Sequence, residues 1–559
     1  MRVLDRLGPR RATILGVVVV ACIAVIPIGW NAVMAAREGW VPEGDGAIIT
    51  LRTHDVLTSN PPLLGNPTTA GRSQPGDVYH PGPLGFFLLA APLRLFGASA
   101  HGMLFGSALV NIASLLGLLW FAYRRGGAPL CLVAGLWAVI LVWALGNEIP
   151  HDSYNPHIVL LPMAFLLMLT WSVVCGDLLA LPFAVAAGSL AAQSHAYEVI
   201  YVAVMAAWII CALALRFPRG RSEPPAGNRR RWIAGSLILG FFLWLPPIID
   251  QILHDPGNLR QLADFARDGG TPVQGISFAV QRAADYLVPP FRWTNRTPGF
   301  YDLVHRPGGL RVALLGLLLA GAVVLAVTAW RRGLRDSALL IVTALVAIGG
   351  SVLAAARLPQ GFATLSPYNH RHWWITATFF WFAIGWTIVD LLRARVPANG
   401  RLALGAAVIA LSVGFAFVAM RNVTIVDDRG SVSFGALEYL TPAAADAVRA
   451  RAGGSQPVAV SSLGPEAFAS VEPGIVSGLV LRGIDARVDR AEAKVFGSAH
   501  SAEDAPTRLV IRSGDDYDQA PQGMDLVATY DPNVDVREKG YRNSGIAGGV
   551  SPLAVYIGS

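Results

Sequence analysis

Long apolar stretches alternate with short polar ones over the first 420 residues of the chain. Eleven of these stretches are apolar over about 20 residues, the length that a helix needs to cross the hydrocarbon core of a bilayer. This pattern predicts an α-helical polytopic membrane protein with about eleven transmembrane helices. The predicted spans are residues 12–34, 101–123, 128–147, 157–175, 179–195, 198–216, 232–250, 310–330, 337–356, 372–392 and 401–420.

Arginine-rich segments separate the apolar stretches in a regular way. With eleven spans they all fall on one side of the membrane: the N-terminus, Arg124-Arg125, and residues 216–231, 331–335 and 393–401. Because loops rich in basic residues stay on the cytoplasmic side, we expect a multi-pass plasma-membrane protein with a cytoplasmic N-terminus. The segment after Met420 is then extracytoplasmic. If residues 179–216 held one re-entrant feature instead of two spans, the basic segment that follows would face outward, against this rule.

The first apolar run follows four arginines, as the apolar core of a signal peptide would. It is longer than such a core, however, and no clear small-residue cleavage site precedes the polar loop. A retained membrane helix is therefore the favoured interpretation of residues 12–34.

Three outer loops, residues 35–100, 251–309 and 357–371, are long or rich in polar groups. The first contains an apolar run from Leu84 to Phe96 that is too short to span a bilayer and fits a helix at the membrane interface. The segment Tyr79-His80-Pro81-Gly82-Pro83 precedes it and predicts a sharp turn, because each proline fixes its φ angle.

Residues 421–559 do not have a membrane-like composition. Helical patterns at 440–451 and 465–482 alternate with β-rich runs at 458–461, 508–512 and 525–530. This order is typical of a small α/β domain. We therefore expect a membrane module over residues 1–420 and an extracytoplasmic α/β domain over residues 421–559, which would bind a partner or cover the membrane site.

The composition agrees with a membrane protein and excludes several functions. Only 14% of the residues are charged, against about 25% in soluble domains. The formal net charge is +7, but the arginines form short clusters rather than one basic face, so no nucleic-acid partner is expected. No P-loop or GxGxxG motif is present, which argues against a nucleotide cofactor. Nearly all 44 basic residues are arginine, a bias typical of a GC-rich genome such as that of an actinobacterium.

The four cysteines carry no predicted chemistry. They all lie inside apolar runs, so the sequence offers neither a disulfide framework nor a CxxC metal site. They are Cys22, Cys131, Cys175 and Cys211.

Asp45 is the leading candidate for a catalytic residue. It follows the first span closely, in the sequence Glu43-Gly44-Asp45-Gly46. A carboxylate just above the bilayer can act as a general base, and the two glycines let the backbone bend around it. Taken alone, Asp45 could equally be a solvated loop acid or the N-cap of a helix over residues 47–56. Glu43 lies two residues before it and Asp55 ten residues after it, so which acid acts is left open.

The next two outer turns are also rich in polar side chains. Residues 147–157 contain Glu148, Asp152 and two histidines, and His195 lies in the following outer turn. Such residues would line a cavity for a polyhydroxylated ligand. The alternative is a polar cap that faces water.

Arg357, His370 and Arg371 are cations on the same side, close to aromatic residues. A guanidinium can hold two phosphate oxygens with two aligned donors, so these residues could clamp a phosphate. They could also simply anchor the chain at the membrane interface. No HExxH or similar ligand spacing is present, so a divalent metal is not indicated.

Together these groups suggest a reaction on the outer face. No nucleotide sugar is available there, so a transferase would need a donor carried by the membrane, such as a sugar on a polyprenyl phosphate. A carboxylate would deprotonate the acceptor hydroxyl, and cations would stabilise the leaving phosphate. A single displacement would invert the anomeric carbon.

The chain resembles the GT-C superfamily of integral-membrane glycosyltransferases over roughly residues 1–420. The resemblance rests on Gly44-Asp45-Gly46 after the first span, on the turn and interfacial helix from His80 to Gly97, and on the acidic loop with Glu148 and Asp152. Many relatives have two adjacent acids in the first loop, whereas Gly44 separates Glu43 from Asp45 here. The chain also looks similar to transferases that build actinobacterial cell-envelope arabinan or mannan.

The resemblance implies a GT-C-like fold, with Asp45 as the base and Arg357 or Arg371 at the donor phosphate. It implies a polyprenyl-phosphate sugar as donor, a cell-envelope glycan, lipid or protein as acceptor, and no cofactor. Residues expected to bind substrate are Glu43, Asp55, His80, Glu148, Asp152, His195, Arg357, His370 and Arg371.

Two other functions remain open at this point. A transporter or lipid flippase often shows two related halves and charged or broken helices at the membrane midplane, and neither is visible here. A non-enzymatic membrane protein with an outer binding domain would lack a cavity at Asp45.

Overall fold

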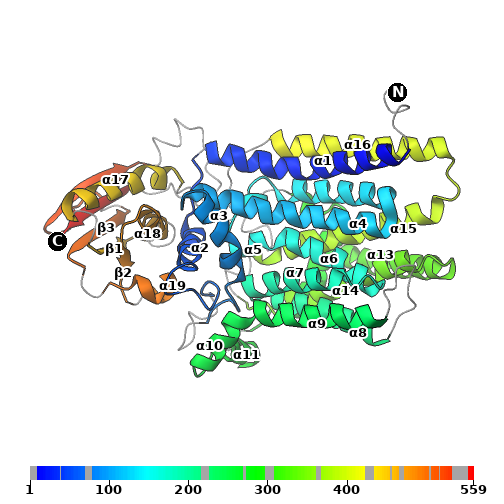
Figure 1. Cartoon of the computed structure of the whole chain (residues 1–559), viewed down its shortest axis with the longest axis horizontal. Helices are drawn as coiled ribbons and strands as arrows, with labels where there is room; N and C mark the ends of the chain where they lie inside the picture. Colours follow the sequence, from blue (N-terminus) through cyan, green and yellow to red (C-terminus); the bar gives the residue numbers. More distant parts are fainter. Residues whose placement is uncertain are drawn as a thin grey trace.

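The computed structural model of the protein describes residues 9–37, 39–68, 78–215, 226–268, 272–295, 308–360, 367–421, 434–452, 456–464, 471–490, 492–502, 505–514, 517–531 and 552–559. They form an elongated molecule, with a bundle of long helices at one end and a smaller domain with a β-sheet at the other (Figure 1). The long helices are α1 (Pro9–Arg37), α4 (Ala100–Leu145), α6 (Leu160–Val174), α7 (Ala180–Ser194), α8 (Glu198–Leu215), α9 (Ala226–Leu243), α13 (Gly309–Arg331), α14 (Arg335–Ala356), α15 (His372–Leu392) and α16 (Ala398–Arg421).

The helices confirm a polytopic membrane protein. Eight helices in the described part of the chain are long and apolar enough to cross a membrane, or nine if α9 and α10 (Leu245–Leu253) form one span bent by 51°. The sequence predicted eleven spans, and α4 and α7 explain the difference. Helix α7 corresponds to the predicted span 179–195 but has only 15 residues, fewer than a span requires.

Helix α4 is a hairpin of two apolar arms. Its backbone leaves the helical region at Gly127, where φ is 67° and ψ is −159°, a conformation that glycine adopts without strain. A Cβ atom at Gly135 would lie 3.8 Å from Cδ2 of Leu119, so the chain on the two sides of the break runs side by side. The arms match the predicted spans 101–123 and 128–147.

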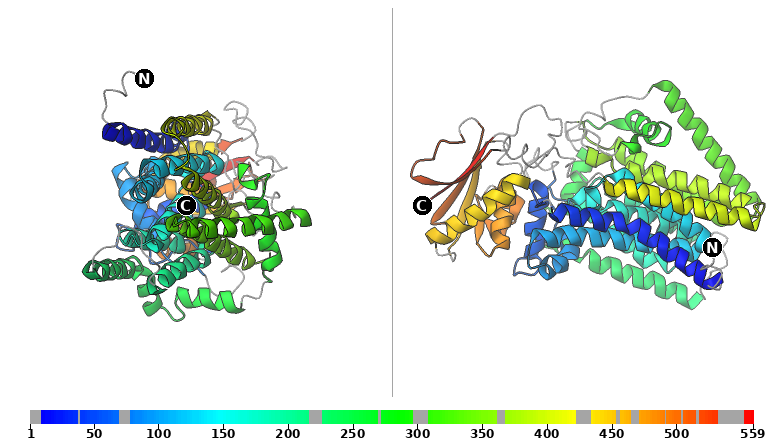
Figure 2. Two further views of the ribbon diagram at one scale, coloured as in Figure 1. Left: turned by 90° about the vertical axis from the view of Figure 1, so that its right-hand side faces the viewer. Right: turned by 90° about the horizontal axis from the view of Figure 1, so that it is seen from above.

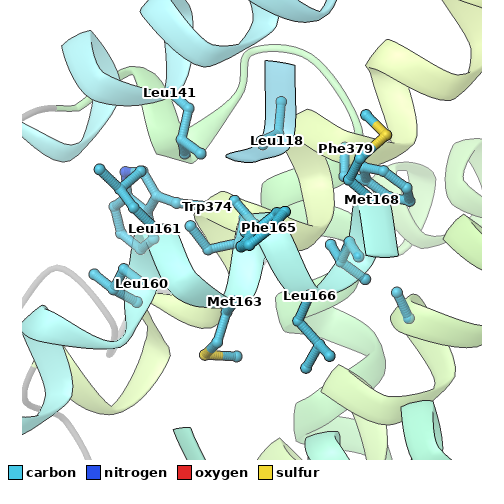
Figure 3. Packing of buried hydrophobic residues seen from close by; sticks show 14 of the residues in the cluster. Leu118, Leu141, Leu160, Leu161, Met163, Phe165, Leu166, Met168, Trp374 and Phe379 are labelled. Carbon is cyan, nitrogen blue, oxygen red and sulfur yellow. The ribbon is translucent and has the colours of Figure 1, made fainter. Parts of the chain in front are cut away.

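Helix α6 is the centre of the bundle. Every residue from Leu160 to Val174 is buried. Figure 3 shows side chains of this helix, such as Phe165 and Met168, together with Leu118 of α4 and Trp374 and Phe379 of α15 in the same buried cluster. A helix that is apolar on all sides is stable only when other elements surround it. The uniformly apolar sequence of α6 therefore explains its central position.

The arginine-rich segments that the structure describes, Arg124-Arg125, the start of α9, and residues 331–335 and 393–401, lie at one end of the bundle, far from the sheet domain (Figure 2). Arg125 binds Asp336, and Arg124 lies 3.2 Å from Asp177, so the turn of the α4 hairpin is tied to its neighbours there. The described arginines among those that predicted the topology thus share one end. That this end faces the cytoplasm remains a prediction.

Short helices cover the opposite end of the bundle. The predicted interfacial helix is present as α3, which carries exposed apolar residues. The short elements are α2 (Gly44–Asp55), α3 (Leu84–Leu95), η3 (Ile149–His151), α5 (Asn155–Ile158), α10, α11 (Asn258–Asp268), α12 (Gly275–Leu287), η4 (Arg292–Thr294) and η7 (Pro367–His370).

The C-terminal part is an α/β domain, as predicted. Its five-stranded sheet has the order β2-β1-β3-β5-β4, in which β1 is parallel to β2 and β3 while β5 is antiparallel to β3 and β4. Three strands were predicted, and β2 and β5 were missed. Residues 465–470 of the second predicted helix lie outside the described residues. The elements are α17 (Phe434–Ala452), β1 (Val458–Leu463), α18 (Glu472–Leu481), β2 (Ala486–Val488), α19 (Ala493–Phe496), η9 (Ser498–His500), β3 (Thr507–Ser513), β4 (Met524–Tyr530) and β5 (Leu553–Gly558).

Helix α2 belongs to two hydrophobic cores. Ile49 is buried in the core of the membrane bundle. Ile48 and Leu51, on another face of the helix, are buried in the core of the sheet domain, where α2 packs on α18. The first outer loop and the C-terminal domain are therefore joined by shared apolar packing, and Asp45 lies in the first turn of the helix that joins them.

Candidate functional site

A cavity of about 1130 Å³ lies at the end of the bundle that carries the short helices. Four of the ten residues that the sequence suggested line this cavity. They are Asp45, His80, His195 and Arg357. They come from α2, the first outer loop, the turn between α7 and α8, and the end of α14, so the fold brings together residues more than 300 positions apart.

Asp45 enters the cavity from the first turn of α2. The helix begins at Gly44, and its N-cap is Glu43, which makes no side-chain capping hydrogen bond. Asp45 is accessible and lines the cavity, whereas Glu43 is 1% exposed and does not line it. An acid in the first helical turn interacts favourably with the helix dipole. Of the neighbouring acids Glu43 and Asp45, Asp45 lines the cavity and Glu43 does not.

A short antiparallel pairing holds the first outer loop against the cavity. The backbone N–H of His80 donates to the carbonyl of Asn66 at 2.8 Å, and the N–H of Thr68 donates to the carbonyl of Val78 at 2.8 Å. Farther on, Gly82 donates its N–H to the carbonyl of Gln193 at 3.2 Å. The turn predicted from the two prolines and the glycine is thus fastened to the end of α7.

His80 and His195 lie together, with ring centroids 5.1 Å apart. Nδ1 of His80 accepts a hydrogen bond from the backbone N–H of Ala196 at 3.0 Å, so the ring proton of a neutral His80 is on Nε2. Burial lowers the pKa of His80 well below its ordinary value. Burial also lowers the pKa of His195 to about 4, although Glu198 opposes this change. Both rings are therefore neutral at pH 7 and offer hydrogen bonds rather than charge.

Tyr154 and Asn155 form a wall of the cavity, and buried polar residues support this wall from behind. Oδ1 of Asp152 accepts the backbone N–H of Tyr154 at 3.1 Å, and Oδ2 lies 2.7 Å from Nδ1 of His157. The amide of Asn155 donates to the carbonyl of Ser194 at 2.9 Å. Asp152 does not line the cavity; it holds the backbone that presents Tyr154.

Helix α11 contributes to the cavity lining, and hydrogen bonds hold its first residue and the segment that precedes α12. The Asn258 side chain accepts the N–H of Tyr79 at 2.8 Å and donates to its carbonyl at 3.1 Å. After the helix, Gln274 donates its N–H to the carbonyl of Leu358 at 2.9 Å. The lining side chains of α11 include Leu259, Leu262 and Arg267.

The cavity has a polar part and an apolar part. Val199 and Ile200 of α8, Leu353 of α14 and the leucines of α11 provide an apolar side. Arg267 and Arg357 add two exposed guanidinium groups to the lining. A cavity of this kind can hold a ligand with an apolar tail and a charged head group, because the tail is desolvated while the head group finds donors and cations.

Other suggested residues lie outside the cavity lining. Asp55 ends α2 and contacts His500 of the sheet domain. Glu148 is 6% exposed, and His370 and Arg371 are fully buried. The guanidinium of Arg371 lies 4.5 Å from the ring centroid of Trp374, so its position is one of packing within the bundle. The geometry therefore favours Arg357 over Arg371 as the cation that meets a ligand here.

Sequence reasoning missed Arg267, Asn66 and Thr68, which also line the cavity. The spacing of Leu259, Leu262 and Ala266 indicates an amphipathic helix that would have placed Arg267 near an apolar surface. Nothing in the local sequence distinguishes Asn66 and Thr68 from ordinary loop residues. No group of three or more His, Cys, Asp or Glu side chains able to hold a metal ion occurs in the described part of the chain.

Comparison of the sequence with known protein families and with curated proteins finds no match. Among solved structures, ArnT from Cupriavidus metallidurans bound to undecaprenyl phosphate is similar to this chain, with 12% identity, 98% of each chain covered and a TM-score of 0.49. The apo state of the same protein gives 11% identity, 97% coverage of each chain and a TM-score of 0.47. At this level the similarity assigns neither a family nor an activity.

Proposed function

We propose that the protein is a membrane glycosyltransferase that takes a sugar from a polyprenyl-phosphate donor. The observation that carries this proposal is one cavity whose lining combines an accessible carboxylate, two guanidinium groups and apolar side chains of α8, α11 and α14. Each part of the donor has a matching part of the cavity: the apolar side for the prenyl chain, Arg357 and Arg267 for the phosphate, and the neutral polar groups for the sugar.

The reaction follows from this arrangement. Asp45 accepts the proton of an acceptor hydroxyl while the hydroxyl oxygen forms a bond to the anomeric carbon. The bond between that carbon and the phosphate oxygen breaks, and its electron pair stays on the phosphate. Arg357 and Arg267 stabilise the charge on the departing polyprenyl phosphate. One displacement of this kind inverts the anomeric centre, and the acceptor is a cell-envelope glycan, lipid or protein.

The proposed topology places this chemistry outside the cytoplasm. The arginine-rich end of the bundle lies opposite the sheet domain (Figure 2), whereas the cavity lies at the end that carries the short helices. Basic loops are retained on the cytoplasmic side. The cavity and the sheet domain would then face the outside, where lipid-linked sugars replace nucleotide sugars. The two histidines supply hydrogen bonds to the substrate without adding charge.

The test is sugar transfer from radiolabelled polyprenyl-phosphate sugars by the purified protein in lipid. Asp45→Asn keeps the shape of the side chain but removes the base, and we expect it to lower turnover by about 100-fold or more while donor binding is kept. Glu43→Gln serves as the matched control, and it should retain most activity because Glu43 does not line the cavity.

A second pair of variants tests the phosphate. Arg357→Ala should weaken binding of polyprenyl phosphate by about 10-fold or more, the worth of a lost charge-assisted contact. Arg371→Lys, on a guanidinium outside the cavity, should leave that binding unchanged if the variant folds. Full turnover by Asp45→Asn would remove this residue from the role. Tight lipid binding without transfer by the wild type would instead indicate a flippase or a binding protein.

A further inference from the structure

Beside the main cavity lies a second, much smaller one. Its volume is about 20 Å³, enough for one water-sized group. Asn66 and Asn155 line both cavities, so the small one adjoins the polar side of the large one. Ser153 and Ser194 are also part of its lining, together with glycines and the apolar side chains of Ile49, Phe86, Leu89 and Ile158. We call it the polar recess.

Three of the polar side chains that line the polar recess are buried and have polar atoms without a hydrogen-bond partner among the described residues. Asn66 is 4% exposed, Ser153 is 1% exposed and Ser194 is 6% exposed. Both the amide oxygen and the amide nitrogen of Asn66 have no hydrogen-bond partner among the described residues, and the same holds for the hydroxyls of Ser153 and Ser194. Buried polar groups are almost always paired in folded proteins. Several unpaired groups around one small space indicate that a ligand completes them.

Backbone hydrogen bonds hold the loop around Asn66 in place. Its carbonyl accepts the N–H of His80, and the N–H of the preceding Gly65 donates to the carbonyl of His80 at 3.1 Å. A Cβ atom at Gly65 would lie 2.8 Å from Cβ of His80, so this close pairing depends on glycine. The loop backbone is thus held in place at Asn66, whose side chain lines both cavities.

We propose that the polar recess binds one hydroxyl group of a sugar, with Asn66 as a residue that determines specificity. This inference rests on the proposed function. An amide both donates and accepts hydrogen bonds, and so does an alcohol. An ionised phosphate only accepts hydrogen bonds, and a prenyl chain does neither. A sugar hydroxyl is the part of such a substrate that matches the unpaired groups in both chemistry and size.

This assignment gives Asn66 a role distinct from that of Arg357. Arg357 binds the phosphate that every polyprenyl-phosphate donor shares, whereas Asn66 forms a hydrogen bond with a hydroxyl of the sugar. A site built to bond a substrate hydroxyl discriminates strongly against an analogue that lacks it, because the protein group is left unpaired. Sugars that differ in hydroxyl position should therefore be separated here.

Binding of purified variants to defined lipids tests the proposal without turnover. The probes are undecaprenyl phosphate, its mannose, glucose and arabinose derivatives, and the free methyl glycosides of the same sugars. For the sugar that the wild type prefers over bare undecaprenyl phosphate, Asn66→Leu should reduce the preference by about 10- to 100-fold, which is about 1.4 to 2.7 kcal/mol. Ser194→Ala should reduce it less, and both variants should bind undecaprenyl phosphate as the wild type does.

Asn60→Leu is the matched control, since Asn60 is an exposed asparagine in the same loop, outside both cavities. Thermal unfolding of the ligand-free proteins separates binding from folding. Asn66→Leu removes an unpaired buried amide, so its melting temperature should equal or exceed that of the wild type. Loss of preference in a variant of unchanged stability supports a ligand role.

The outcomes separate this inference from the function it rests on. If the lost preference concerns the lipid-linked sugars, the recess serves the donor; if it concerns only the methyl glycosides, the recess serves the acceptor. If the wild type prefers a sugar and Asn66→Leu keeps the full preference, the recess holds only water and the inference is overturned while the transferase proposal stands. If the wild type binds no polyprenyl phosphate at all, both fall.

Discussion

The imidazole of His500 contacts the carboxylate of Asp55, with Nε2 3.1 Å from Oδ1 and 3.3 Å from Oδ2. The contact joins the sheet domain to the C-terminal end of α2, the helix whose first turn carries Asp45. Arg52, one turn before Asp55, adds a guanidinium group, with Nη1 3.4 Å from Oδ2 of Asp55. The two side chains of the His500–Asp55 pair are 10% and 5% exposed, so water screens the interaction only weakly.

We expect this pair to fix α2 for catalysis. Asp55→Asn and His500→Ala should each lower the melting temperature, and the double variant should show a coupling of about 1 to 3 kcal/mol. Amide hydrogen exchange in α2 and α18 should become faster in each variant, and sugar transfer should fall in parallel. Asp446→Asn is the control, because its ion pair with Arg449 is on the surface and such pairs contribute little. Equal exchange in wild type and His500→Ala would contradict the prediction.

The buried histidines make stability depend on pH. Burial lowers the pKa of His151 and of His195 to about 4, while the unfolded chain keeps values near 6.5. Between pH 6.5 and 4 the unfolded state binds more protons, so the unfolding free energy falls as the pH falls. The loss is on the order of 3 kcal/mol per histidine across this window.

The measurement is the melting temperature of the protein in detergent at a series of pH values. It should be nearly constant between pH 7 and 8 and should drop steadily below pH 6.5. His151→Gln tests one contribution, since both ring nitrogens of His151 lack hydrogen-bond partners among the described residues and the residue is not part of the cavity lining. Its curve should be less steep than that of the wild type; an identical slope would show that another group causes the acid loss.

Gly82 is required by close packing at the loop turn. A Cβ atom there would lie 2.3 Å from Oε1 of Gln193 and 2.8 Å from Cγ of Pro247. Gln193 cannot move freely, because its amide donates to the carbonyl of Leu243 at 2.8 Å and its oxygen accepts the N–H of Leu84. Gly82→Ala should therefore destabilise the protein by about 1 to 3 kcal/mol and reduce sugar transfer further, by displacing His80.

Gly349→Ala provides the comparison for this variant. A Cβ atom at Gly349 would meet nothing within 4 Å, and alanine favours the helix in which it lies. Its melting temperature should be at or above that of the wild type. If Gly82→Ala unfolds at the same temperature as Gly349→Ala, the turn tolerates a side chain and the packing argument is wrong.

Much of the fold was predictable because most of its helices come from long apolar runs in the sequence. A run of apolar residues such as Leu160–Val174 is stable in a membrane protein only as a helix. The arginines near Arg124 correctly predicted which helix ends lie together. Short elements gave weaker signals. Strand β2 has three residues, too few for a pattern. Helix α2 was expected only as one alternative for a polar loop. Its apolar residues Ile48 and Leu51 pack against a domain nearly 400 residues away in the sequence, and the local sequence does not reveal that contact.

The candidate site was predictable only as a region. Sequence spacing places Asp45, His195 and Arg357 at the same end of their helices, and the structure brings them to one cavity. Spacing does not specify which way a side chain points. Arg371 therefore looked equivalent to Arg357, although it lies within the bundle on Trp374. Asn66 gave no signal, because its isolation depends on distant groups that surround it.

The double packing of α2 affects how the chain can be divided. A fragment that ends near residue 420 would expose on α2 the hydrophobic surface that Ile48 and Leu51 now bury, and an isolated tail would have a gap where those two side chains belong. Expressed separately, each half would be prone to aggregate, and mixing the two halves should restore solubility only if the helix inserts into its pocket on the tail.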